Sequence, residues 1–292
     1  MRQGRLWHRR LVYAMLLALV AVALAACEAL FAPLPPTPQA EGEPVPAPQM
    51  VRLAVAPAAL PLAEDLRAAY RGFRPGVAIE ILPMSSEQAY SMATAGQVDL
   101  AIVSAPDEPS LRRWAPALSW QPLAQDGLAI VTHRDHPLPR ITRRDLGSLF
   151  AGYVADWATL EAGSGAPKLA IQGTDATARQ LFDSVIMGER EVTSAALVLP
   201  HDGAVLAYVA ENPLAIGYLS AAYLGRDERV KVIALDHLLP TRSQLEGDGY
   251  PLRYTLFLAQ APGAHDEAAR LRTFALGRAG QEAIGQRYGL PR

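Results

Sequence analysis

Short apolar runs alternate with amphipathic segments along the chain from residue 51 onward. The runs at 52–56, 77–82 and 97–103 predict strands, because each is short and mostly apolar. Between the first two, apolar residues recur with helical spacing over 62–73, which predicts a helix with one buried face. Strands that alternate with such helices are typical of an α/β protein whose sheets are mainly parallel.

The same alternation continues towards the C-terminus. Further strands are predicted at 127–132, 168–172, 215–219, 230–234 and 250–258. Further helices are predicted at 143–150, 176–187, 203–211 and 265–288. The chain has 292 residues, of which 50% are hydrophobic, so it is long enough to form two lobes that each bury a core.

The first 27 residues differ from the rest and predict a processing signal. Four arginines before residue 11 form a basic start, and the apolar run 11–26 that follows is too short for an ordinary membrane-spanning helix. Small residues then precede Cys27, the only cysteine of the chain, as in a bacterial lipobox. We therefore expect a signal peptide at 1–26 and a lipid on Cys27, and the alternative is a signal anchor with an incidental cysteine.

Residues 27–49 are rich in proline and predict an extended, semi-rigid tether, because proline fixes φ and removes backbone donors. A lipid followed by such a tether implies a module outside the cytoplasmic membrane, anchored to that membrane through Cys27. A single cysteine also excludes a disulfide within the chain and any metal site built from several cysteines.

Charge and motifs argue against several classes of function. The net charge is −2, so no basic surface for nucleic acid is expected. The chain contains no Gly-x-Ser-x-Gly elbow, no phosphate-binding P-loop and no His-Glu-x-x-His motif, and we expect no catalytic residue, no cofactor and no enzyme. His133 and His136 have a metal-like spacing, but the neighbouring prolines indicate a surface turn. His201 and Asp202 are interpreted as a helix N-cap, and Trp157 as packing.

Three corners where a predicted strand meets a predicted helix carry the candidate binding residues. They lie at 56–59, 83–88 and 173–179, and the second contains Ser85 and Gln88 in the spacing of a capping box. Ligands of open α/β sheets bind at such corners, where helix N-termini present backbone donors. Thr174 or Asp175 is the expected N-cap of the third helix. Pure helix capping is the alternative role for each of these polar residues.

Several stretches resemble the phosphate-type solute-binding proteins of ABC importers. They follow the family's order over nearly all of 51–292, and they are 141–152 with Asp156 and Trp157, 211–218, 250–252, and the closing 280–281 and 288–289. The resemblance implies a two-lobed type II periplasmic-binding-protein fold, in which each lobe is a mostly parallel sheet with flanking helices and two hinge strands join them. Lobe 1 is expected at 50–130 and 250–292, and lobe 2 at 131–249. The implied partners are a small solute between the lobes and an ABC permease.

The resemblance also implies where a phosphate or another oxyanion would bind, but the family's hydroxyl and glycine loops are poorly kept. The first loop falls on residues without a hydroxyl, and in the third only Arg179 matches. Three outcomes stay open at this point: phosphate binding, binding of a less charged solute, and a cleft that has lost its ligand, as in a sensor or accessory lipoprotein. The candidate ligand-binding residues are Ala56, Pro57, Ala58, Ser86, Ser104, Gln172, Thr174, Asp175, Thr177 and Arg179.

Overall fold

The computed structural model describes residues 49–247 and 249–291, and all of them belong to one structural unit. The predicted signal peptide, Cys27 and the tether as far as residue 48 lie outside the described residues. Gln49, the last residue of the predicted tether, is the first residue of a strand. Among the helices described, none is long and apolar enough to cross a membrane.

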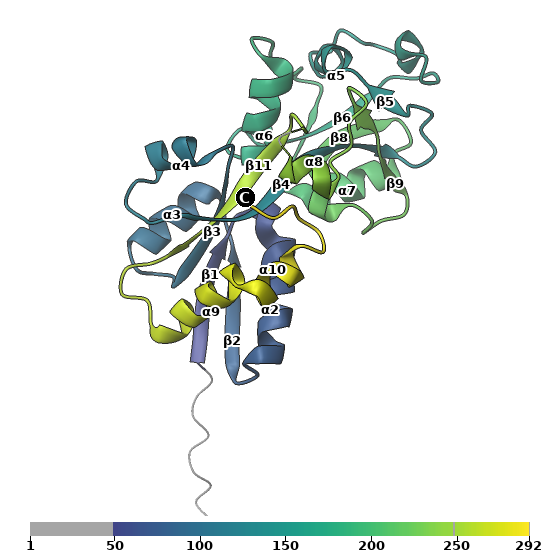
Figure 1. Ribbon diagram of the computed structural model, residues 1–292. Helices are drawn as coiled ribbons and strands as arrows, with labels where there is room; N and C mark the ends of the chain where they lie inside the picture. The colour runs from purple at the N-terminus through teal and green to yellow at the C-terminus, as the bar shows by residue number, and fades with distance from the viewer. Residues whose placement is uncertain (1–48, 248, 292) are drawn as a thin grey trace, which may run out of the picture. The chain divides into compact units, whose positions relative to one another are not determined.

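The larger sheet has two halves that are each built from parallel strands (Figure 1). In the first half, β1 lies between β2 and β3 and runs parallel to both. In the second half, β6 lies between β7 and β8 and is again parallel to both neighbours. The strands are β1 Gln49–Val55, β2 Val77–Pro83, β3 Leu100–Ala105, β6 Lys168–Gln172, β7 Leu197–Leu199 and β8 Ala215–Ser220.

One long strand, β4 (Gln121–His133), passes from one half to the other. Its first part pairs antiparallel with β11 (Arg253–Gln260), and its second part, from Leu128, pairs antiparallel with β8 and with β9 (Val230–Val232). The fold class expected from the sequence, a two-lobed α/β protein, is confirmed. The predicted lobe boundaries stay a prediction, and the one at 130/131 falls inside β4.

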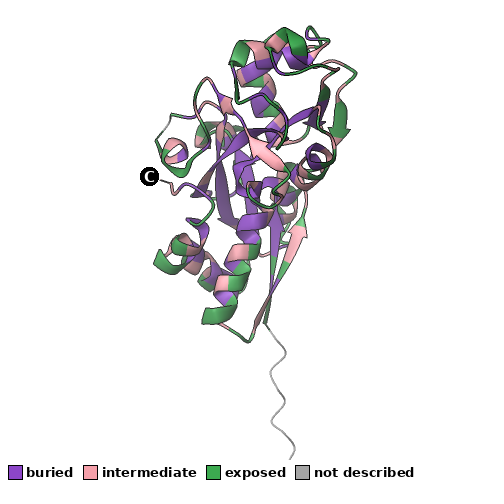
Figure 2. Ribbon diagram, turned by 90° about the vertical axis from the view of Figure 1, so that its right-hand side faces the viewer, coloured by how far each residue is buried: buried purple, intermediate pink, exposed green. Residues whose placement is uncertain are grey.

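Helices cover both faces of the first half because each has one apolar side. The inner residues of α2 (Leu60–Phe73), α9 (Asp266–Leu276) and α10 (Arg278–Ile284) share one buried cluster, which continues into the second half. On the opposite face, α3 (Ser86–Thr94) and α4 (Glu108–Trp114) bury a separate cluster. Figure 2 shows the strands buried between the exposed outer sides of these helices.

The second half repeats this layering with its own helices. One face is covered by α5 (Arg143–Phe150) and α6 (Thr177–Phe182), and the other by α7 (Asp202–Glu211), whose Val205 and Val209 form a third cluster. The remaining elements are β5 Arg140–Ile141, β10 Ala234–Leu235, α8 Arg242–Glu246, the 3-10 turns Pro57–Ala59, Trp157–Leu160 and Ala221–Tyr223, and the π-helical turn Asp183–Met187.

Trp157 packs in the core, as expected, with its ring fully buried and its Nε1 donating to the carbonyl of Leu214 at 3.1 Å. The surface turn expected around the two histidines is wrong for His136. This side chain is buried, and its ring centroid lies 4.3 Å from that of Trp157. In the described part of the chain, no group of three or more His, Cys, Asp or Glu residues has a geometry that could hold a metal ion.

Several predicted elements have different bounds in the structure, and three of the larger differences have a local explanation. The predicted helix at 265–288 is two helices, because Gly277 has extended backbone angles between α9 and α10. The predicted helix at 176–187 is α6 followed by the π-helical turn. The predicted strand at 250–258 starts only at Arg253, and the Tyr250 hydroxyl instead donates to the carbonyl of Leu128 at 2.7 Å.

Candidate functional site

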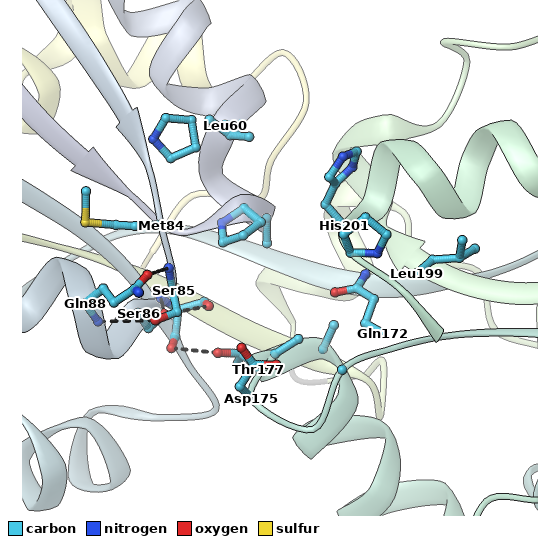
Figure 3. A pocket seen from close by; sticks show the side chains of 18 of the residues that line it. Leu60, Met84, Ser85, Ser86, Gln88, Gln172, Asp175, Thr177, Leu199 and His201 are labelled. Atoms are coloured by element: carbon cyan, nitrogen blue, oxygen red, sulfur yellow. Dashed lines mark hydrogen bonds between the residues drawn. The ribbon is translucent and has the colours of Figure 1, made fainter. Parts of the chain in front are cut away.

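A cleft of about 560 Å³ lies where parallel strands of both halves of the sheet end (Figure 3). Its walls come from the segments that follow β1 and β2, from Ser104 near the end of β3, and from the segments that follow β6 and β7. In open α/β sheets, ligands bind outside the carboxyl ends of the strands, because the loops there are free to diverge from the scaffold. The cleft is therefore the candidate functional site.

The structure brings most of the predicted site residues to this cleft. Those that line it are Pro57, Ala58, Ser86, Ser104, Gln172, Asp175 and Thr177. The other predicted residues, Ala56, Thr174 and Arg179, do not line it. Ala56 is buried and its N–H donates to the carbonyl of Ile102. The Nε of Arg179 donates to both carboxylate oxygens of Asp183, at 2.8 and 2.9 Å. For all ten residues, a role in ligand binding stays a prediction.

Three side-chain hydroxyls lie close together where the two sides of the cleft meet. The hydroxyl oxygens of Ser86 and Ser104 lie 3.3 Å apart, and the N–H of Ser104 donates to the Ser86 hydroxyl at 3.2 Å. From the second half, the Thr177 hydroxyl donates to the carbonyl of Ser104 at 3.2 Å. A group that sits between these residues would contact both halves of the sheet at once.

The helix starts at the cleft agree with the sequence at two places. Ser85 and Gln88 form the expected capping box, since the Gln88 N–H donates to the Ser85 hydroxyl and the Ser85 N–H donates to the Gln88 side chain. His201 is the expected N-cap of α7, with its Nδ1 accepting from the N–H of Ala204 at 3.1 Å. Because Nδ1 accepts, the proton of the neutral ring is on Nε2.

The third helix start differs from the prediction. The N-cap of α6 is Ala176, and no side chain caps it, so the expectation that Thr174 or Asp175 is the cap is wrong. The helix therefore starts one residue later than a cap at Asp175 predicts and two later than a cap at Thr174, after a turn in which the N–H of Ala176 donates to the carbonyl of Gly173. Asp175 Oδ1 lies close to Gly173, and a Cβ added to Gly173 would be 2.7 Å from this oxygen.

Sequence reasoning missed the apolar part of the cleft. Figure 3 shows Leu60 and Met84 on one side and Leu199 on the other. His201 was interpreted only as a cap, yet it also lines the cleft. The segment around Leu199 faces the cleft because β7 is the neighbour of β6 at the sheet edge, and strand order cannot be deduced from one sequence.

Behind the cleft, Gln172 connects to a buried polar network. Its Nε2 donates to Asp202 Oδ1 at 3.0 Å, and the N–H of Ser220 donates to the same oxygen at 2.7 Å. The hydroxyls of Ser220 and Tyr254 both donate to Asp126 Oδ2 at 2.6 Å. The network therefore runs from the cleft to β4, at the point where β4 changes its pairing from β11 to β8.

Both carboxylates of this network are fully buried and are not paired with a lysine or arginine among the described residues. Removal from water disfavours a charge, so burial raises the pKa of Asp126 to about 7 and also raises the pKa of Asp202. The hydroxyl donors act in the opposite direction but do not cancel the effect of burial on the pKa of Asp126.

The profile of the PBP superfamily domain matches residues 39–276. The chain belongs to the PBP superfamily. Among solved structures of this fold, one described as a phosphate ABC transporter substrate-binding protein from Clostridium perfringens, with bound phosphate, superposes with a TM-score of 0.74. It is 20% identical, and the match covers 83% of this chain and 99% of that one. An ABC-type phosphate transport receptor from Vibrio cholerae gives a TM-score of 0.64 at 21% identity, covering 82% and 100%.

The same superfamily fold also occurs in regulators. The regulatory domain of Synechocystis CcmR, solved with 2-PG, gives a TM-score of 0.54 at 17% identity and covers 84% of this chain and 100% of that domain. Because these identities are low, the structural matches establish the shared fold and not a shared ligand. The resemblance to phosphate-type binding proteins noted from the sequence agrees with the two matches to phosphate transport proteins.

The walls of the cleft carry little charge. Among the described residues that line it, no lysine or arginine is present, and Asp175 is the only carboxylate. The remaining polar groups are hydroxyls, amides and the His201 ring. Neutral donors and acceptors therefore dominate the polar part of the site.

Proposed function

We propose that this protein is the extracytoplasmic solute-binding protein of an ABC importer, without catalytic activity of its own. The observation that carries the proposal is the cleft, which residues from both halves of the sheet line at the carboxyl ends of their strands. A small molecule in this position would contact both halves. The matches to phosphate transport proteins support transport as the purpose of such capture.

The proposed mechanism is capture followed by closure. A ligand that bridges two lobes favours the arrangement in which both contact it, so binding shifts the population towards a closed state. The Thr177 hydroxyl reaches the carbonyl of Ser104 from the other half, and this contact between the two walls supports the proposal. The closed form would be the one that an ABC permease recognises.

Blocking the cleft tests this function. Val198 on β7 lines the cleft and is 59% exposed, so Val198→Trp should fill the cleft without disturbing the core. A thermal-shift screen across oxyanions, sugars and amino acids first identifies a solute that binds the full chain. We expect Val198→Trp to weaken that solute by about a hundredfold or more, because an indole would occupy its volume.

Leu197→Trp is the matched control. Leu197 is the neighbouring residue of the same strand and is 42% exposed, but it does not line the cleft. Leu197 is the first residue of β7 and lies farther from the strand end at which the cleft opens, so this tryptophan should leave binding within about threefold of the parent chain. Equal dissociation constants for both variants and the parent would place the solute elsewhere and contradict the proposal.

We also propose that a lipid on Cys27 anchors the protein, with the proline-rich segment as a tether. The support is the sequence alone, because these residues lie outside the described ones. Cys27→Ser is expected to abolish incorporation of radiolabelled palmitate in the expressing cells. It should also move the protein from the membrane fraction to the supernatant. Unchanged labelling of the variant would show that Cys27 is not the lipidated residue.

The alternative is a non-transport sensor or accessory lipoprotein with a degenerate cleft. The fold is shared with regulatory domains, and the anion-binding loops of the phosphate-type family are poorly kept here. Vesicles that contain a candidate ABC permease from the same organism distinguish the two. A receptor should stimulate ATP hydrolysis by the permease when its solute is added, whereas a sensor should not.

A further inference from the structure

We propose that the solute is an uncharged organic molecule, larger than an inorganic oxyanion, with an apolar body and a hydroxyl- or amide-bearing end. This inference rests on the proposed function, since it names the solute class of the same cleft. It departs from phosphate, which the family resemblance suggested. Three features of the cleft support it: the few charged side chains, the backbone N–H groups that are already hydrogen-bonded, and the apolar residues of the walls.

The charges around the cleft disfavour an anion. Among the residues that the structure describes, no lysine or arginine lines it, and Arg179, the guanidinium expected to hold an anion, instead donates through Nε to Asp183. His201 accepts a hydrogen bond at Nδ1, so in this arrangement its ring is neutral. Asp175 adds a carboxylate to the wall. A dianion placed here would lose its hydration without a paired cation, which costs several kcal/mol.

Backbone donors that an anion would use are partly occupied. At the first corner, Pro57 has no N–H, and the N–H groups of Ala56 and Ala59 donate to backbone carbonyls. At the second corner, the capping box uses the N–H groups of Ser85 and Gln88. A tetrahedral oxyanion needs many convergent donors, and the N–H groups already engaged at these two corners could serve one only if their existing hydrogen bonds broke.

The walls instead fit a molecule with apolar surface. Leu60 and Met84 lie on one side, and Val198 and Leu199 on the other. The volume of about 560 Å³ lies within the range of pockets that bind drug-sized organic ligands. Apolar walls favour apolar ligand surface, since its burial removes that surface from water.

A polar end of the ligand has neutral partners at the base of the cleft. The hydroxyls of Ser86 and Ser104 lie 3.3 Å apart, and the Thr177 hydroxyl reaches the carbonyl of Ser104 from the other half. The amide of Gln172 faces the cleft, held by its hydrogen bond to Asp202 (Figure 3). Hydroxyl and amide groups recognise ligand hydroxyls, carbonyls and amides without a charge, and this selects the uncharged class.

Calorimetry on the full chain in detergent tests the solute class. The probes are inorganic phosphate and sulfate as anions, choline as a cation, and a panel of uncharged nucleosides and alkyl glycosides. We expect no heat from either anion up to millimolar concentration and micromolar binding of at least one uncharged probe. The affinity of that probe should be independent of salt concentration, because charge screening does not act on a neutral ligand.

Two reasons for weak phosphate binding are possible, the lack of a cation and the presence of the Asp175 carboxylate, and a matched pair of variants distinguishes them. Asp175→Asn removes the carboxylate that lines the cleft, and Glu87→Gln removes an exposed carboxylate beside it that does not. Neither variant is expected to bind phosphate, because neither supplies a cation. Micromolar phosphate binding by Asp175→Asn would overturn the inference, since the cleft would then be an anion site masked by one residue.

The outcomes distinguish this inference from the function on which it rests. Micromolar phosphate or sulfate binding by the parent chain overturns the solute class and leaves the receptor function intact. Tighter binding of choline than of any uncharged probe also overturns the class, in favour of cations selected by Asp175. Absence of binding by every probe of the panel and of the solute screen overturns both the class and the receptor function.

Discussion

Asp126→Asn is expected to remove a loss of stability that the parent protein suffers as the pH rises from about 4 to about 8. Burial raises the pKa of Asp126 from its ordinary 3.8 to about 7 in the folded protein. Between these values the folded state binds more protons than the unfolded state, so the free energy of unfolding falls as the pH rises. The stabilising contribution of Asp126 is fully present below pH 3.8 and is lost once the pH exceeds about 7. Its size is about 4 kcal/mol.

The measurement is urea unfolding of both proteins across this pH range. The asparagine is nearly isosteric but presents an amide to Ser220 and Tyr254, so a constant offset of about 1–3 kcal/mol between the proteins is expected at every pH. The informative quantity is the free energy of unfolding of the parent minus that of the variant. This difference should fall as the pH rises, because only the parent loses the contribution of Asp126. Asp266→Asn, on an exposed residue of α9, is the control for the same exchange at the surface. A flat difference for Asp126→Asn would show that Asp126 is ionised in the folded protein throughout.

The position of Asp126 connects this stability effect with the cleft. Asp126 and Asp202 are linked through Ser220, and Asp202 in turn holds Gln172 at the cleft wall. Two buried carboxylates that share a neighbour disfavour each other's charge, so a proton retained on one eases ionisation of the other. The same residues lie where β4 passes between the halves of the sheet, so the network connects the two halves.

Much of the fold was predictable because its signals are local. The helix at 143–150 and the strand at 168–172 were predicted with the bounds that the structure has. The same holds for the capping box at Ser85, because its two hydrogen bonds involve residues three positions apart. Helix α4 was missed, since seven residues give too little periodicity to detect. The first part of β4 was missed because it carries Gln125 and Asp126, polar residues whose partners come from distant strands.

The candidate site was predictable only in part, for a related reason. The rule that ligands bind at the ends of parallel strands brought seven predicted residues to one cleft. The rule says nothing about which side chains turn inward, and Arg179 turns to Asp183, four residues further along its own helix and the π-helical turn. The wall formed by Val198 and Leu199 depends on the order of the strands, which involves contacts far apart in the sequence.

Gly280→Ala is expected to lower the free energy of unfolding by about 3 kcal/mol, at the upper end of what overpacking usually costs. Gly280 lies in the first turn of α10, where the helix crosses the end of α9. A Cβ at this position would be 2.2 Å from the carbonyl oxygen of Phe274 and 2.7 Å from the Cα of Ala275. Both are backbone atoms, so the whole helix must move to relieve the clash. That movement would also strain the hydrogen bond from Gln281 Nε2 to the carbonyl of Ala275, which is 2.9 Å long.

Gly72→Ala is the matched control, because it adds the same methyl group to another helical glycine. Gly72 lies near the end of α2, and a Cβ there would meet nothing within 4 Å. Alanine has the higher helix propensity, so this variant should be more stable than the parent by about 0.5–1 kcal/mol. Thermal unfolding of the full chain should therefore give a midpoint about 6–12 °C below the parent for Gly280→Ala and slightly above it for Gly72→Ala. Equal midpoints for the two variants would mean that α10 does not cross α9 this closely.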